Sequence, residues 1–314
     1  MRLIKPSYDI WDASYSLERI LEHIERAGRV CYKSEDRIKY DKWDNSLTAM
    51  PFVNKLIESG HLSVLEHGTI YLKIVNREDV LYKDFLDAAA WYYDNSYSRV
   101  NEVHSLGDSI YYVTTNYRVL AENSRLEDLR YLCAPTEYHE KRVTVRFVCD
   151  RGVSHEFVRH RVFSFAQEST RYCNYSKNKF SNEVTFIKPC WMNIPEGKYT
   201  NIVKQSPEDG EYKQIMLHEN NINAYPLTTT SEGRFLWHCY WCEHDYFDLL
   251  SQGWTPQQAR AVLPNSLKTE LVMTGFISDW KHFFELRDSN KAHPQARELA
   301  SPLHKEFIKR GLIE

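Results

Sequence analysis

Residues 141–172 constrain the fold more than any other stretch, because an alternating apolar pattern gives way there to a cation-rich segment. The run KRVTVRFV over 141–148 alternates as a β-strand does, with successive side chains pointing to opposite faces. After the turn marked by a glycine, Ser154 is of a type preferred at helix N-caps, and Glu156 occupies the first turn, where an acid is favoured. We therefore predict a strand followed directly by a helix over 154–163.

Three cations, Arg159, His160 and Arg161, stand side by side in this predicted helix, and Arg171 follows. Consecutive helical residues lie about 100° apart around the axis, so these side chains fan outward and cannot all contact one partner. A ligand with separate anionic and acceptor points suits such a fan, for example a nucleotide phosphate, a uracil edge or a flavin ring. A solvated face, an ion-pair network or a nucleic-acid groove are the alternatives. The aromatic neighbours favour a partnered site, because an unpaired charge held against a core is costly.

Five segments together resemble the flavin-dependent thymidylate synthases. Arg159-His160-Arg161 followed by Ser164 and by QESTRY over 167–172 is similar to that family's Arg-His-Arg and Ser-x-Arg signature. The remaining four are HLSVLEH at 61–67, RVCY at 29–32, ARAVLP at 259–264 and FELR at 284–287, each similar to a shorter motif of the family. The resemblance covers most of the chain outside 76–141 and 191–230.

The resemblance implies roles for individual residues. It assigns the flavin cofactor FAD to His61, Ser63, Arg159, His160, Arg161, Gln167 and His282. It assigns the nucleotide dUMP to Glu156, Arg159, Gln167, Glu168, Ser169, Arg171, Arg260 and Arg287. Arg287 is the expected catalytic residue, since a cation beside the pyrimidine favours ionisation of N3. Three positions depart from the family pattern: Gln167 stands where an acid is common, and Phe276 and His282 replace asparagines that approach the flavin.

The reaction implied by the resemblance is reductive methylation of dUMP to dTMP. Methylenetetrahydrofolate would supply the carbon, NADPH would reduce FAD, and the reduced flavin would deliver the hydride. None of the seven cysteines has a recognisable nucleophile setting, such as a His pair at a helix start, and this route needs none. The resemblance also implies a homotetramer whose active sites are shared between subunits.

The predicted fold class is α+β, with a central, mostly antiparallel sheet flanked by helices. Strand patterns occur at 69–75, 143–148 and 184–187, and helical spacing occurs between them. We expect one catalytic domain over 1–314, with insertions at about 76–141 and 191–230, because no Gly/Ser/Pro-rich linker brackets them. The aromatic segment 235–250 is predicted to be a buried helix. Its Cys239-x-x-Cys242 lacks a second Cys/His pair at the spacing of a zinc site, so no metal is expected.

Composition excludes some classes of protein. The chain has 314 residues and a formal net charge of −3, which argues against general nucleic-acid binding. No run of about 18 apolar residues predicts a membrane span, and seven cysteines at irregular spacing fit a reducing cytoplasm. Two alternatives stay open. One is a nucleic-acid-binding module that uses the helix over 154–163. The other is a metal-dependent hydrolase that uses the histidines His61, His67, His155 and His160.

Overall fold

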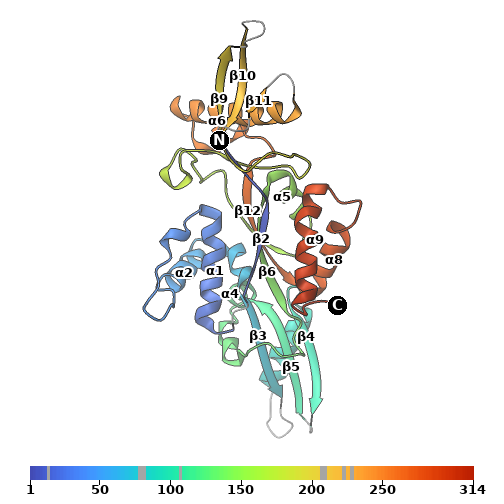
Figure 1. Cartoon of the computed structure of the whole chain (residues 1–314). Coiled ribbons are helices and arrows are strands. Elements are labelled where there is room, and N and C mark those ends of the chain that lie inside the picture. The colour runs from blue at the N-terminus through green and yellow to red at the C-terminus, as the bar shows by residue number, and fades with distance from the viewer. Residues whose placement is uncertain (13–14, 77–82, 106–107, 206–210, 221–223, 227–229) are drawn as a thin grey trace.

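The computed structural model describes residues 1–12, 15–76, 83–105, 108–205, 211–220, 224–226 and 230–314, and Figure 1 shows an elongated molecule of mixed α and β structure. Its strands form three sheets, and most neighbouring strands run antiparallel. The mixed α+β class and the antiparallel character are confirmed. The expectation of one central sheet is corrected, because the three strands predicted from sequence belong to three different sheets.

The middle sheet has the strand order β2-β6-β12-β7 and is antiparallel throughout. Its strands are β2 (Ser7–Trp11), β6 (Arg142–Asp150), β12 (Lys268–Phe276) and β7 (Ser164–Gln167). β12 pairs with β6 along its whole length, from Lys268 opposite Asp150 to Phe276 opposite Arg142. The predicted strand 143–148 is therefore confirmed, and its partner strand lies more than a hundred residues away along the chain.

Helices cover both faces of this sheet. On one face lie α1 (Leu17–Tyr32), α2 (Ala49–Glu58) and the 3-10 turn η2 (Leu62–His67), and on the other lie α5 (Arg151–Phe157), α8 (Ile277–Arg287) and α9 (Pro294–Lys309). Successive β12 residues alternate between them: Val272 packs with the α1 side, whereas Leu271 and Met273 pack with α8 and α9. Because side chains alternate along a strand, the sheet separates the two cores that pack against its faces.

The other two sheets extend the molecule at its two ends (Figure 1). One has the order β3-β5-β4 and is built from β3 (Thr69–Asn76), β5 (Asp108–Asn116) and β4 (Arg99–Ser105), with α3 (Lys83–Asp94), α4 (Tyr117–Glu122) and the 3-10 turn η3 (Leu126–Tyr131). The predicted strand 69–75 is confirmed as β3, and its alternating residues Ile70, Leu72 and Ile74 are fully buried. The pattern over 117–132 also predicts a helix, but this segment is split into α4 and η3.

The five-stranded sheet has the order β11-β10-β9-β1-β8, with β1 and β8 parallel. It contains β11 (Ala224–Pro226), β10 (Tyr212–His218), β9 (Gly197–Gln205), β1 (Arg2–Ile4) and β8 (Thr185–Ile187), and it packs with α6 (Ser231–Ser251) and α7 (Pro256–Ala259). The predicted buried helix over 235–250 corresponds to α6. The segment 191–230 is more than an exposed polar loop, because Tyr199 and Met216 of its hairpin are fully buried against α6.

A helix is present near the predicted position 154–163, but the prediction is wrong about where it begins and where it ends. Helix α5 begins after Asp150, whose carboxylate accepts the Val153 N–H at 2.8 Å, and it ends at Phe157. Beyond that point the N–H of His160 bonds the Phe157 carbonyl at 3.1 Å, a tight three-residue turn. The chain must reverse there to add β7 to the sheet, so the Arg-His-Arg triplet lies in a turn and not on a helix.

In the part of the chain that the structure describes, no helix is both long and apolar enough to cross a membrane.

Replacement of Trp280 by alanine tests the α8 side of the core. Trp280 is fully buried, and its indole N–H donates to the Val143 carbonyl at 3.1 Å. We expect Trp280→Ala to lower the free energy of unfolding by about 3–5 kcal/mol through the cavity it creates. The control Trp43→Ala, at a ring that is 70% exposed, should change it by less than about 0.5 kcal/mol. Equal effects in chemical denaturation would contradict the packing described.

Candidate active site

Arg287, at the end of α8, is held by three hydrogen bonds to two residues that follow β6. Its Nη1 donates to a carboxylate oxygen of Glu156 at 2.6 Å, and its Nη2 donates to the Glu156 carbonyl at 2.8 Å. Its Nε donates to Nε2 of His160 at 2.9 Å. A guanidinium has five N–H donors, so one N–H on each terminal nitrogen stays available. Arg287 is therefore fixed in orientation and can still bind two acceptors.

His160 is neutral in this arrangement, because its Nε2 accepts a hydrogen bond from a cation. Its side chain is buried, and burial, then the charges of Arg287 and His282, lower the pKa of His160 to about 4. The charge of Arg159 also acts on Arg287, and the His282 ring lies 6.3 Å from the His160 ring. The structure therefore brings Glu156, Arg159, His160, His282 and Arg287 together on the α8 side of the middle sheet.

Glu168 belongs to a buried ion cluster whose other members lie outside the sequence motifs. Lys268 contacts a carboxylate oxygen of Glu168 and one of Glu270 at 2.7 Å each, and Lys33 contacts Glu270 at 2.7 Å. Burial alone would raise the pKa of Glu270, but Lys268 and Lys33 outweigh it and hold that pKa at about 2. The second carboxylate oxygen of Glu168 is buried without a hydrogen-bond partner among the described residues. The sequence carries one signal for this cluster. Lys268 and Glu270 are two residues apart and therefore lie on the same face of β12, which is otherwise largely apolar.

Gln167 points away from this cluster. Its amide nitrogen donates to the hydroxyl groups of Ser154 at 2.9 Å and Thr269 at 3.2 Å, toward α5. Gln167 and Glu168 are neighbours in an extended chain, so their side chains lie on opposite faces of the sheet. Two residues predicted for dUMP are thus directed to different sides of the middle sheet.

The predicted Ser-x-Arg segment docks at the end of α1. The Ser169 N–H donates to the Cys31 carbonyl at 2.9 Å, and the Tyr172 ring lies 5.2 Å from the Tyr32 ring. Arg260 reaches the same turn, donating from Nη1 to the Thr170 hydroxyl at 3.0 Å. Arg171 itself is exposed. The segment therefore lies on the α1 side, and Arg260, another predicted residue, contacts it.

A groove of ≈ 700 Å³ lies beside this segment. Its cations are Arg29, Arg37, Lys55 and Lys179, its rings are Tyr32, Phe52 and Tyr172, and His61 also lines it. No Asp or Glu is among its lining residues. Arg29 is neutralised by Glu25 at 2.8 Å, whereas the Lys179 ammonium contacts backbone carbonyls, at 2.8 Å for that of Lys33. The groove thus combines uncompensated positive charge with flat aromatic surface.

The remaining predicted residues are exposed. His61 and Ser63 begin the η2 turn on the α1 side, and Arg161 lies in the turn between α5 and β7. Apart from Arg161, the predicted residues therefore form two sets on opposite faces of the middle sheet. The α1 set contains His61, Ser63, Glu168, Ser169, Arg171 and Arg260, and the set directed to the α5 and α8 side contains Glu156, Arg159, His160, Gln167, His282 and Arg287.

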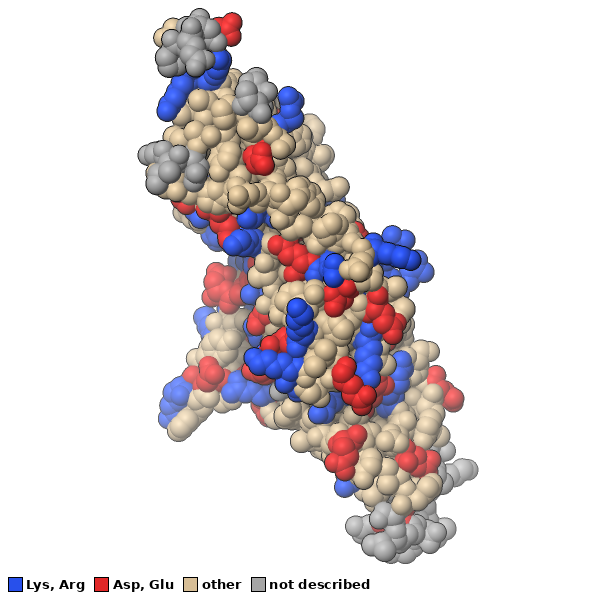
Figure 2. Space-filling view, turned by 45° about the vertical axis from the view of Figure 1, so that its right-hand side comes forward, with Lys and Arg blue, Asp and Glu red and all other residues tan. Residues whose placement is uncertain are grey.

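The described residues give little support to the two alternatives, a metal-dependent hydrolase and a nucleic-acid-binding module. Among the described residues, no three His, Cys, Asp or Glu side chains are grouped so that they could hold a metal ion. Figure 2 shows Lys and Arg side chains interspersed with acids over the central body of the face drawn. A continuous basic stripe, the footprint of a nucleic-acid groove, is not seen on that face.

Comparison with known proteins adds independent findings. The family model described as thymidylate synthase complementing protein matches residues 16–102 and 135–310, so its break falls at 103–134 and inside the insertion predicted at 76–141. A flavin-dependent thymidylate synthase of Mycobacterium marinum is 30% identical over 162 residues, which are 50% of this chain and 54% of that protein. One from Pyrococcus furiosus is 27% identical over 165 residues, 52% of this chain and 53% of that protein.

The chain spans about half the length of the curated relatives it matches. Among solved structures, the UMP/dUMP methylase PolB of Streptomyces cacaoi, bound with 5-Br dUMP, aligns over 98% of this chain and 93% of its own, with 17% identity and a TM-score of 0.39.

The pairing of His160 with Arg287 predicts a specific pH response. The pKa of His160 is about 4 in the folded chain and about 6.5 when unfolded, so its stabilising contribution is complete above pH 6.5 and is lost as the pH falls through 4. Arg287→Gln should raise the pKa of His160 but leave it below 6.5, since burial is the larger cause. Lys281→Gln, at an exposed cation of the same helix, is the control. An NMR titration of the ring with the same pKa in all three proteins would refute the pairing.

Proposed function

The chain belongs to the family of thymidylate synthase complementing proteins, and on that premise we propose that it is a flavin-dependent thymidylate synthase. The proposed reaction is the reductive methylation of dUMP to dTMP, with methylenetetrahydrofolate as carbon donor and NADPH as reductant of FAD. The proposed setting is the cytoplasm, where a nucleotide-forming enzyme meets these substrates. The proposed unit is one catalytic domain, with 76–141 and 191–230 as elaborations of it.

The observation that carries the proposal is the acid-free groove beside the Ser-x-Arg segment. A volume of ≈ 700 Å³ falls in the range typical of cofactor sites. Lys55, Arg37 and Lys179 offer cations to phosphates, and Tyr32 and Phe52 offer faces for flat rings. FAD carries both kinds of group, so the residues present fit it. His61, which the family resemblance assigns to the flavin, lines this same groove.

When bound, FAD supplies hydride transfer, and the chain's own residues supply positioning and charge. Arg171, with its planar fork of donors, would bind the phosphate of dUMP in a bidentate manner. Arg287 keeps two N–H donors beyond those used on Glu156 and His160, and these would bind the pyrimidine near N3. Its positive charge would favour the deprotonated ring. Glu156 and His160 would prevent Arg287 from turning away.

No cysteine is needed in this scheme, and the described thiols are poorly suited to act as nucleophiles. Cys173, the nearest to the Ser-x-Arg segment, is fully buried, and burial raises its pKa to about 12. Cys31, also beside that segment, has its pKa raised to about 11 by burial. A thiol must ionise to act as a nucleophile. These cysteines are therefore proposed to be structural.

The separation of the two residue sets supports active sites shared between subunits. Arg171 lies on the α1 side of the middle sheet and Arg287 on the α8 side, and the packed sheet keeps them apart within one chain. Both are proposed to bind dUMP. A second subunit would have to supply one of them, and closed symmetry then makes each chain contribute to more than one site. We propose a homotetramer of this kind.

A flavin titration and a turnover assay test the activity. The purified chain should bind FAD, with visible absorbance, and should convert dUMP to dTMP in the presence of methylenetetrahydrofolate and NADPH. Lys55→Glu, which places an acid in the groove, should weaken FAD binding by roughly tenfold through charge repulsion. Lys305→Glu, an exposed lysine on α9, should not. A chain that stays colourless with excess FAD, or forms no dTMP, would overturn the proposal.

Complementation tests the shared site. Arg171→Ala and Arg287→Ala proteins should each be nearly inactive, because each lacks one contact to dUMP. Unfolding and refolding them together should restore partial activity, since some sites of the mixed tetramers carry neither substitution. The Arg171→Ala protein unfolded and refolded alone provides the control. Verified mixed tetramers as inactive as their parents would show that both residues act in the same chain.

A further inference from the structure

Helix α6 packs one of its faces against β9, β10 and β11 at one end of the molecule (Figure 1). Its buried residues, among them Leu236, Cys239 and Tyr246, recur every three or four positions and belong to the apolar cluster of that end. Because a helical turn takes 3.6 residues, the opposite face contains the positions within about 60° of residue 241 around the axis. These residues form the outer face of α6: Arg234, Trp237, His238, Trp241, His244, Asp245 and Asp248.

Two tryptophan rings lie along the middle of the outer face. The Trp237 and Trp241 rings are 5.5 Å apart, and the Trp241 ring is 4.8 Å from the His244 ring. Trp237 also packs at the edge of the apolar cluster, whereas Trp241 makes its ring contacts with described residues within α6 alone. Large aromatic side chains of this kind are enriched where one protein binds another.

The charges at the two ends of the outer face are opposite in sign. Arg234 lies near the start of α6 and Asp248 near its end; both are exposed, and neither forms an ion pair with a described residue. The Asp248 carboxylate is bonded by the Gln252 amide instead, at 2.7 Å. The helix dipole favours the reverse order of charges, so these two do not stabilise α6. About 21 Å of helix separates them, so they cannot pair within one chain.

A second α6 that crosses the first in the opposite direction would satisfy both ends. Trp241 is the middle residue of the helix, and Arg234 and Asp248 lie two turns before and after it. An antiparallel copy centred on Trp241 therefore brings Arg234 opposite the partner's Asp248, and this pair occurs twice. The spacing of seven residues between these three positions keeps them on one seam of two packed helices. A parallel copy would instead place Arg234 opposite its own counterpart, which repels it.

We propose that the outer face of α6 binds the outer face of α6 in a second copy of this chain, antiparallel, around a two-fold axis at Trp241. Such a contact uses the same patch on both subunits. A single helix pair is smaller than the ~1,200–2,000 Å² that stable interfaces bury, so it would act beside another contact. A tetramer with two-fold symmetry needs two kinds of interface, and the α6 pair would be the second. The tetramer rests on the proposed function, whereas the α6 contact requires neither flavin nor nucleotide.

An exchange of charges in α6 tests the contact, with the molecular mass measured by sedimentation velocity on the full chain without ligands. Arg234→Asp and Asp248→Arg each place like charges opposite one another, twice in the interface. Each should raise the dissociation constant roughly a hundredfold, so that tetramers separate into dimers. The double variant Arg234→Asp/Asp248→Arg restores opposite charges and should restore the tetramer. Both substitutions give α6 the charge that its dipole favours, so a weaker helix would not explain the loss.

Lys305→Glu, at an exposed lysine on α9, is the control for charge reversal and should keep the wild-type mass. A wild-type dimer that the single variants turn into a monomer would support the α6 contact and refute the tetramer, so the two proposals fail separately. A monomeric wild-type chain, or a mass that neither single variant changes, would overturn the α6 contact. In either case the occupant of the outer face would be a different macromolecule.

Thiol crosslinking tests the direction of the helix pair. In a chain whose exposed Cys190 is replaced by serine, Trp241→Cys should form a covalent dimer with a short bis-maleimide. Asp248→Cys in the same background should not, because antiparallel helices separate the two copies of position 248 by about 21 Å. The Cys190→Ser chain alone measures the background reaction of the other thiols. Crosslinking at position 248, or at neither position, would refute the antiparallel register.

Discussion

Burial of the middle sheet on both faces is the constraint on which the other features depend. Strand β12 runs through its centre, and its successive residues face two different cores. A sheet packed by helices on each side cannot let side chains from one face reach the other. The two sets of predicted residues are therefore held apart by the core itself, and this separation is the reason for proposing a site that two chains share.

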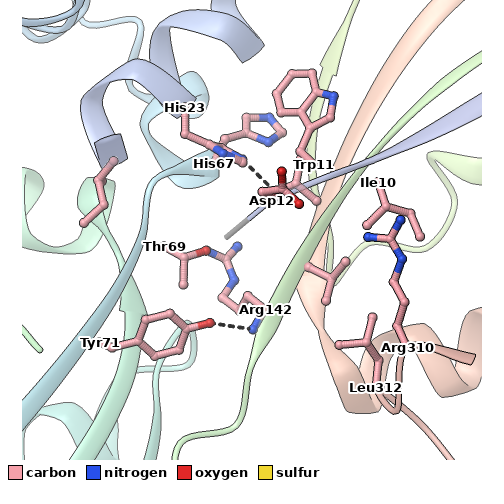
Figure 3. Close-up of a pocket in the computed structure, with 13 residues that line it drawn as sticks. Ile10, Trp11, Asp12, His23, His67, Thr69, Tyr71, Arg142, Arg310 and Leu312 are labelled. Atoms are coloured by element: carbon pink, nitrogen blue, oxygen red, sulfur yellow. Dashed lines mark hydrogen bonds between the residues drawn. The ribbon is translucent and has the colours of Figure 1, made fainter. Parts of the chain in front are cut away.

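The α1 face of this sheet carries an unusual amount of buried charge, and most of it is compensated. Lys268, Glu168, Glu270 and Lys33 neutralise one another through contacts of 2.7 Å. Such clusters persist when every charge has a partner, because breaking one pair leaves a buried charge uncompensated. Arg142, on the same face (Figure 3), departs from this rule, because it forms no ion pair with a carboxylate of the described residues and is held by the Glu66 carbonyl and the Ser164 hydroxyl. The α8 face has its own clamp, in which Glu156 and neutral His160 hold Arg287.

Local sequence signals predicted the elements well and their arrangement poorly. The strand over 69–75 and the helix over 235–250 are both present, because each has a strong period and clear ends. The helix expected over 154–163 failed, since Ser154 and Glu156 suggest a helix start but Asp150 caps it earlier. What ends it at Phe157 is the pairing of β7 with β12, a contact between residues about a hundred positions apart that no local pattern reveals.

The sequence by itself determined the family, the mixed α and β class and the identity of the residues proposed for the site, because motif spacing and hydrophobic period are written locally. Only the tertiary structure decided how these residues are distributed. It placed Gln167 and Glu168 on opposite faces, gave Glu168 its partner Lys268, and set the groove of Lys55 and Lys179 beside the Ser-x-Arg segment. Long-range strand pairing fixes which face each side chain occupies, and a shift of one residue would exchange the faces.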